Sequence, residues 1–151
     1  MTGVQTCALP ISFETDYGGV VSNTRYIEYL ERGRYALLQN AGLSVNRVLE
    51  ECGVQAVVRR IDIEYLSPAR HEELLELHVE VLSHSGATTT IFSQLFRKND
   101  KVLLMRATQT LAYVNREMRA ARVPKTYRDA LPPETANEPE ASATGLPDSV
   151  M

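Results

Sequence analysis

The pattern of apolar and polar residues shows one long amphipathic segment at residues 24–41. Its apolar side chains recur at Ile27, Leu30, Leu37, Leu38 and Ala41. This period of 3.6 residues predicts a helix, and 18 residues make it roughly 27 Å long. A polar residue in 22–24 can cap its start, and Gly42 stands where a helix-ending glycine belongs. A short helix over residues 45–52, ending at Gly53, is expected next.

After this helix the period changes to two, which predicts β-strands. Four strands are expected, over residues 54–66, 74–82, 87–98 and 101–114. The second alternates most regularly, with its apolar residues on one face and the polar residues Glu76, His78 and Glu80 on the other. Short connections, such as the turn at Asn99-Asp100, favour antiparallel neighbours. With a short strand before the helix, the pattern predicts an α+β domain whose antiparallel sheet wraps around one long central helix.

Length and charge narrow the class of protein. A chain of 151 residues suits one domain, and its net charge of −3 is small. Residues 131–151 contain four acids and no Lys or Arg, so the remainder carries +1. Binding of nucleic acid needs a strongly basic face, and a membrane span needs about 18 apolar residues in a row. Neither pattern is present, and no signal peptide is visible in the sequence, so we expect a cytoplasmic protein.

The two ends differ from the middle of the chain. Residues 2–11 read TGVQTCALPI, the translation of a common sequencing-library adapter, ACTGGAGTTCAGACGTGTGCTCTTCCGATC. We therefore interpret residues 1–11 as a foreign segment, residues 12–131 as the folded domain and residues 132–151 as a tail. The tail is rich in Pro, Glu, Ala, Ser and Thr and lacks aromatic residues, which predicts disorder.

The chain contains two cysteines, Cys7 and Cys52. They allow at most one disulfide, and no Cys/His cluster has the spacing of a metal site. Because Cys7 falls in the foreign segment, Cys52 is expected to be a lone thiol that behaves as a small buried hydrophobic side chain.

One motif carries a family resemblance. Residues 16–21 read DYGGVV and are followed by Asn23, Tyr26 and Glu31. With IDIEYLSPAR at 61–70 and RVPKTYRDAL at 122–131, this motif resembles the hotdog-fold thioesterases, in particular the 4-hydroxybenzoyl-CoA thioesterase-like branch with its acyl-CoA thioester hydrolases. The resemblance runs from Phe13 to about Leu131. It implies a homodimer or homotetramer with joined sheets, active sites at the subunit interface, and no metal or other cofactor.

The same resemblance implies the roles of the site residues. Asp16 would be the catalytic carboxylate, either as a general base for water or as a nucleophile that forms an anhydride. Backbone N–H groups at the helix start would hold the thioester oxygen as an oxyanion hole. The oxyanion and substrate-binding candidates are Gly19, Val20, Val21, Ser22, Asn23 and Tyr26. Many relatives carry Tyr-His where this chain has Ser22-Asn23, so a backbone donor remains but an imidazole does not.

Other residues have both a functional and a structural interpretation. The candidates for contacts with CoA phosphates are Arg59, Arg60, Arg70 and Arg119, although exposed arginines are usually just solvated. Tyr26 would either line the acyl pocket or pack on the sheet, and Glu31 is expected on a solvated or salt-bridged helix face.

Two other functions remain open. A non-catalytic acyl-CoA-binding module would not need Asp16. A dehydratase of this fold would need a histidine paired with an acid, and the sequence shows no such pair among His71, His78 and His84. We interpret these histidines as core or surface residues.

Overall fold

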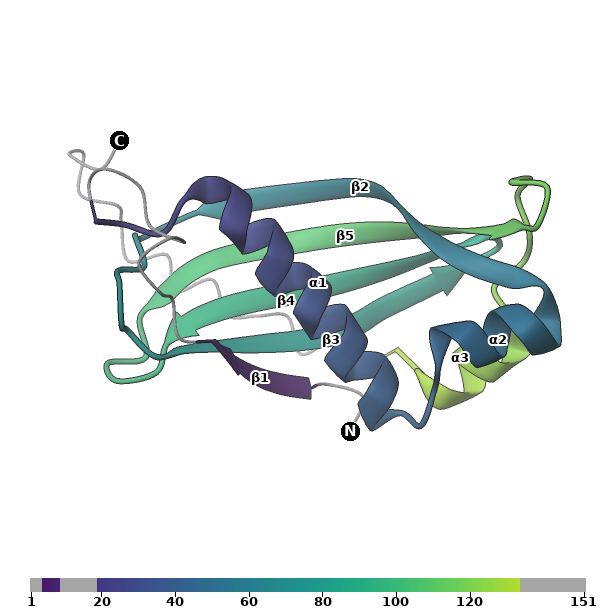
Figure 1. Cartoon of the computed structure of the whole chain (residues 1–151), viewed down its shortest axis with the longest axis horizontal. Coiled ribbons are helices and arrows are strands. Elements are labelled where there is room, and N and C mark those ends of the chain that lie inside the picture. Colours follow the sequence, from purple (N-terminus) through teal and green to yellow (C-terminus); the bar gives the residue numbers. More distant parts are fainter. Residues whose placement is uncertain (1–3, 9–18, 134–151) are drawn as a thin grey trace.

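The computed structural model describes residues 4–8 and 19–133, with side chains described for 19–133. Its elements follow in the order β1 (Val4–Ala8), α1 (Asn23–Asn40), α2 (Val45–Cys52), β2 (Val54–Tyr65), β3 (Leu75–Ser85), β4 (Thr88–Arg97), β5 (Leu103–Asn115) and α3 (Lys125–Ala130). The strands form one antiparallel sheet in the order β1-β3-β4-β5-β2. Figure 1 shows α1 running diagonally across one face of this sheet. The predicted α+β fold is confirmed.

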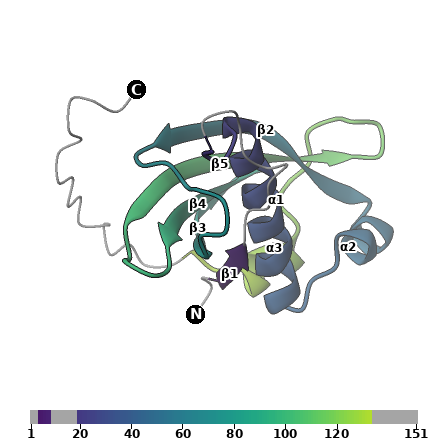
Figure 2. The same ribbon diagram turned by 60° about the vertical axis from the view of Figure 1, so that its left-hand side comes forward.

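Helix α1 lies unusually close to the sheet at one point. A Cβ atom added to Gly33 would come 2.6 Å from Cδ2 of Leu77 and 2.8 Å from Cγ2 of Val79, both on β3. The buried side chains of α1 face the same way, and they are Tyr26, Tyr29, Leu30 and Leu37. Figure 2 shows the sheet curving around this helix. The apolar period of the sequence therefore marks the face that packs on β3, and a glycine permits the closest approach.

Strand β1 forms one edge of the sheet. It pairs antiparallel with β3, from Val4 opposite Val79 to Ala8 opposite Leu75. These residues lie in the segment that we interpret as foreign. Ladder hydrogen bonds come from the backbone, so a chain of another origin can occupy this edge. The division at residues 1–11, 12–131 and 132–151 stays a prediction, and residues 134–151 of the tail lie outside the described part. Resequencing the source DNA for a continuous upstream reading frame tests it.

The sequence analysis missed helix α3. It packs beside the sheet through Tyr127, whose ring contacts that of Tyr113 with centroids 5.5 Å apart. His84 fastens its end: Nε2 donates to the carbonyl of Leu131 at 2.6 Å, and Nδ1 lies 2.8 Å from the hydroxyl oxygen of Thr89. Since a carbonyl can only accept, Nε2 of His84 carries a proton. His84 is therefore a structural residue.

The expectation for Cys52 was wrong. Its thiol is free and exposed at the last residue of α2. Helix α2 lies at one end of the sheet, where Val48 is its one buried residue. The last turn therefore stays in solvent, and Gly53 ends the helix in the left-handed conformation with φ of 66°.

Candidate active site

The segment that enters α1 is fastened to the loop after β2. Val20 forms a β-bridge with Arg70, and the N–H of Val21 donates to the carbonyl of Ala69 at 2.7 Å. Both Val21 and Ala69 are buried. Gly19, just before them, is exposed with φ of +75° and has no heavy atom within 4 Å of an added Cβ. The backbone therefore turns in open space at Gly19 and is held rigidly from Val20 onward.

The start of α1 offers backbone N–H donors. Ser22 is the N-cap but makes no side-chain cap bond, because its hydroxyl lies 3.3 Å from that of Thr24 instead. The N–H of Arg25 donates to the carbonyl of Ser22. Among the described residues, none accepts from the N–H groups of Asn23 and Thr24. Of the predicted donors, Val21 is thus engaged with Ala69, whereas Asn23 keeps an N–H at the positive end of the helix dipole.

Three tyrosines pack around this helix start. The hydroxyl of Tyr26 accepts from the N–H of Ala69 at 3.2 Å, and its ring meets those of Tyr29 and Tyr65 edge to face. Tyr65, at the end of β2, donates from its hydroxyl to the carbonyl of Asn23 at 3.0 Å. Partial burial raises the pKa of Tyr65, so it stays a neutral donor. Tyr26 is buried. The sequence analysis did not single out Tyr65 by itself, although this residue belongs to the family segment IDIEYLSPAR at 61–70.

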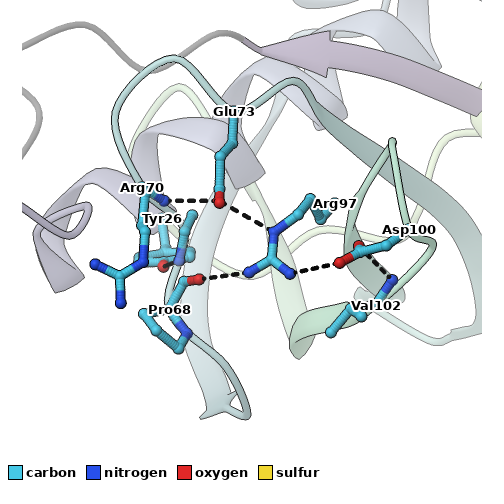
Figure 3. A network of polar contacts seen from close by, with 8 residues as sticks. Tyr26, Pro68, Arg70, Glu73, Arg97, Asp100 and Val102 are labelled. Atoms are coloured by element: carbon cyan, nitrogen blue, oxygen red, sulfur yellow. Dashed lines mark hydrogen bonds and ion pairs between the residues drawn. The ribbon is translucent and has the colours of Figure 1, made fainter.

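A second set of contacts fixes the loop that holds Ala69 (Figure 3). Arg97, at the end of β4, donates from Nη2 to the carbonyl of Pro68 at 3.2 Å and from Nη1 to Asp100 at 2.8 Å. Its Nε lies 3.1 Å from the carboxylate of Glu73, which also accepts from the N–H of Arg70. The hydrogen bond from Arg97 lowers the pKa of Asp100, so the carboxylate stays ionised. One guanidinium thus joins β4, the β4–β5 turn and the loop under α1.

Replacing Arg97 with Met should lower the free energy of unfolding by about 1–3 kcal/mol, because the partly buried carbonyl of Pro68 and carboxylate of Glu73 lose their contacts with the guanidinium. Arg97→Lys should recover little of the lost stability, because a single ammonium group cannot contact Pro68, Glu73 and Asp100 at the same time. Urea unfolding measures both, and Arg47→Met is the matched control. Arg47 lies on α2 with its side chain 72% exposed, so its loss should change stability by less than about 0.5 kcal/mol. Equal effects of Arg97→Met and Arg47→Met would contradict the assignment.

The four arginine candidates for CoA contacts do not form one surface within a chain. Arg59 and Arg60 are exposed in the middle of β2, where a bulge shifts the register, and Arg60 pairs with Asp62 at 2.8 Å. Arg70 lies beside the start of α1. Arg119 lies at the other end of β2, since it follows Asn115, the partner of Val54.

The remaining acid and histidine candidates lie elsewhere. Glu31 and His71 are exposed. His78 and Glu76 do form a histidine–acid pair at 2.6 Å, which the sequence interpretation missed. They alternate with Leu77 and Val79, whose side chains face α1, so this pair lies on the opposite face of the sheet from the helix. The described part of the chain contains no cluster of His, Cys, Asp and Glu suited to a metal ion, and none of its helices is long and apolar enough to cross a membrane.

Asp16 itself lies outside the described residues. Support for its role therefore has to come from the family to which the chain belongs. A model of the Thioesterase-like superfamily matches residues 12–136. The chain belongs to this superfamily. The acyl-CoA thioester hydrolase YbgC of Escherichia coli O6:H1 is 35% identical over 94 residues, which cover 62% of this chain and 69% of that relative. The acyl-CoA thioesterase YbgC of Haemophilus influenzae is 33% identical over 118 residues, covering 78% of this chain and 85% of the relative.

Solved structures show the same fold for this thioesterase. A 4-hydroxybenzoyl CoA thioesterase variant complexed with 4-hydroxybenzoyl CoA superposes with a TM-score of 0.78 at 16% identity. The superposition covers 86% of this chain and 99% of the other. The predicted family, the hotdog fold and the enzyme class, a thioester hydrolase, are confirmed.

Proposed function

We propose that this thioesterase hydrolyses acyl-CoA thioesters to a free acid and CoA, with Asp16 as the catalytic carboxylate. The observation that carries the proposal is the start of α1, where the N–H groups of Asn23 and Thr24 have no acceptor among the described residues. They follow directly on the segment that contains Asp16 and are held in place through Val21 and Ala69. The two YbgC relatives, named as acyl-CoA thioesterases, support the choice of substrate.

The chemistry needs a carboxylate and donors on opposite sides of the acyl carbon. As a base, Asp16 takes a proton from water while the water oxygen attacks the thioester carbonyl. The carbonyl oxygen becomes an oxyanion, which the N–H groups of Asn23 and Thr24 stabilise. The C–S bond then breaks, and CoA leaves as the thiolate and takes up a proton. As a nucleophile, Asp16 attacks the carbonyl itself, and water hydrolyses the resulting anhydride.

We propose that two copies of the chain join along β2. This strand is 12 residues long and pairs with β5 on one side, while its other side has no neighbour in the described sheet. Three exposed apolar side chains lie on this strand and on the helix that crosses the sheet, namely Val58 on β2 and Ile27 and Tyr35 on α1. Tyr35 and Val58 line the same cavity. Antiparallel pairing of two β2 edges would bring the start of one α1 beside the first half of the other chain's β2. The active site would then contain residues of both copies.

Replacing Ile27 with Glu should weaken this dimer at least about tenfold, because it would bury a carboxylate without a partner at the interface. Sedimentation equilibrium measures the dissociation constant. The control is Val102→Glu, since Val102 is similarly exposed but lies after the β4–β5 turn. A wild-type chain that is monomeric at micromolar concentration would refute the dimer.

Thiol release from a panel of acyl-CoAs tests the proposed activity. Turnover of at least one member at a rate well above the uncatalysed reaction is expected. Tight acyl-CoA binding without thiol release would instead support the non-catalytic module. Protein with a restored native N-terminus should be assayed beside this chain, so that a foreign first segment does not decide the result.

A further inference from the structure

A cavity of about 120 Å³ lies between the C-terminal half of α1 and the sheet. Helices α2 and α3 and strands β2, β4 and β5 contribute the rest of its wall. Most of the lining is apolar, for example Leu37, Ile91 and Leu111, and the exposed residues Tyr35 and Val58 belong to the lining on the open-edge side. A cavity of about 150 Å³ in another protein holds benzene. The cavity here therefore suits an apolar group of about that size or slightly smaller.

Arg34 is the only charged residue in this lining, as far as the chain is described. Its guanidinium donates through Nη1 to Oε1 of Gln109, a completely buried residue on β5. The amide of Gln109 in turn lies 3.5 Å from the hydroxyl of Ser93, which is also fully buried. The contact with Ser93 thus holds the side chain of Gln109 in place. Gln109 offers one neutral acceptor to the guanidinium of Arg34, which has five N–H donors.

No carboxylate of a described residue forms an ion pair with Arg34. Partial burial lowers the pKa of Arg34, opposed by the charge of Glu31, yet arginine stays protonated at neutral pH. Buried charges are normally paired, because removing a charge from water without a partner is costly. The guanidinium therefore has donors left for an acceptor that enters the cavity.

The other polar groups of the lining are uncharged, so none of them would repel an anionic acceptor. The hydroxyls of Thr89 and Tyr113 lie 3.0 Å apart and are hydrogen-bonded to each other. Burial raises the pKa of Tyr127 to about 12, so its phenol is neutral. An anion beside Arg34 would meet no repulsive charge in the lining.

We propose that this cavity binds the apolar body of a small organic acid, whose carboxylate is held by Arg34. Carboxylates match the planar guanidinium fork and form its strongest hydrogen bonds. Two sources share this chemistry: a free carboxylic acid, or the far end of a dicarboxylic acyl group on CoA. The second source rests on the proposed function and dimer, in which the start of the other chain's α1 comes beside the first half of β2. The acyl group would enter past Tyr35 and Val58.

Isothermal titration of the full chain with benzoate and with benzamide, its neutral isostere, tests the pocket. Benzoate should bind at least tenfold more tightly than benzamide, and Arg34→Met should remove that difference. Arg47→Met removes an equal charge from an exposed position and should retain it. Ala56→Leu keeps Arg34 but fills the cavity, so it should lose benzoate binding even if Arg34→Met proves unstable. Equal binding of the two probes, no binding of benzoate, or undiminished binding to the folded Arg34→Met variant would each overturn the proposal.

Thiol release then separates the two sources. If the pocket takes the acyl end, kcat/KM for the CoA thioester of hexanedioic acid should exceed that of hexanoyl-CoA at least tenfold, and Arg34→Met should abolish the preference. Benzoate binding through Arg34 without this preference assigns the pocket to a free acid. Absence of thiol release from every acyl-CoA would refute the proposed function, whereas the benzoate titration would still decide the pocket.

Discussion

Replacing Asp16 with Asn is expected to lower kcat for acyl-CoA hydrolysis by about 10²–10⁴-fold, the usual contribution of a positioned base. The amide has nearly the same shape but cannot take a proton from water, and it is a far weaker nucleophile than a carboxylate. The donors at the start of α1 stay in place, so substrate binding should change little. Single-turnover thiol release, together with KM, measures the two effects separately.

The matched control is Glu31→Gln, which removes the other acid of the family motif. Glu31 is exposed on α1, and its loss should leave kcat within about twofold, as expected for a surface substitution. Thermal unfolding of both variants shows whether the fold is intact. A large loss for Glu31→Gln with activity retained in Asp16→Asn would transfer the role to Glu31. Rapid quenching and mass analysis of the protein decide between base and nucleophile, because only the nucleophile adds the acyl mass to the chain.

Replacing Gly33 with Val should destabilise the protein by about 3 kcal/mol or prevent folding, at the upper end of overpacking effects. The first added carbon already comes 2.6 Å from Leu77 and 2.8 Å from Val79. Both neighbours are buried side chains of β3 with almost no exposed area, so neither can move aside without displacing others. Gly33→Ala should cost less, since the gain in helix propensity, about 1 kcal/mol, offsets part of the clash.

Urea unfolding with a constant slope gives these free energies. Gln39→Val, at an exposed position of the same helix, controls for the poor helix propensity of Val and should cost only a few tenths of a kcal/mol. If Gly33→Val were as stable as Gln39→Val, the close approach of α1 to β3 would be refuted. A loss of stability in Gly33→Val but not in Gln39→Val would show that α1 packs closely against β3 at Gly33.

The sequence predicted the long elements well because burial imposes their periods. The predicted helix at 24–41 differs by one residue at each end from α1, and the alternation of β3 appears as buried Leu75, Leu77 and Val79. Helix α3 escaped because six residues are too few to show a period. Its position depends on a distant residue, His84, and no local pattern reports that contact.

The details of the candidate site were less accessible for the same reason. The N–H of Val21 is hydrogen-bonded to Ala69, and the position of Ala69 depends on the path of β2 and of the loop that follows it. The sequence likewise did not show that Arg70 and Arg119 stand at opposite ends of β2, because that follows from the register with β5. Cys52 was misjudged because its exposure depends on how far α2 extends past the sheet.

The strand order β1-β3-β4-β5-β2 has a consequence for how the chain folds. Strands β3, β4 and β5 pair with their immediate neighbours in sequence, so this meander can form from short loops. Strand β2 must wait for β5, the last strand to be synthesised, and the apolar face of α1 has no sheet to cover until β3 is paired. Non-local pairing of this kind slows folding, and a nascent chain exposes apolar surface meanwhile. On the ribosome, α1 and β2 would therefore be the segments most in need of protection by a chaperone.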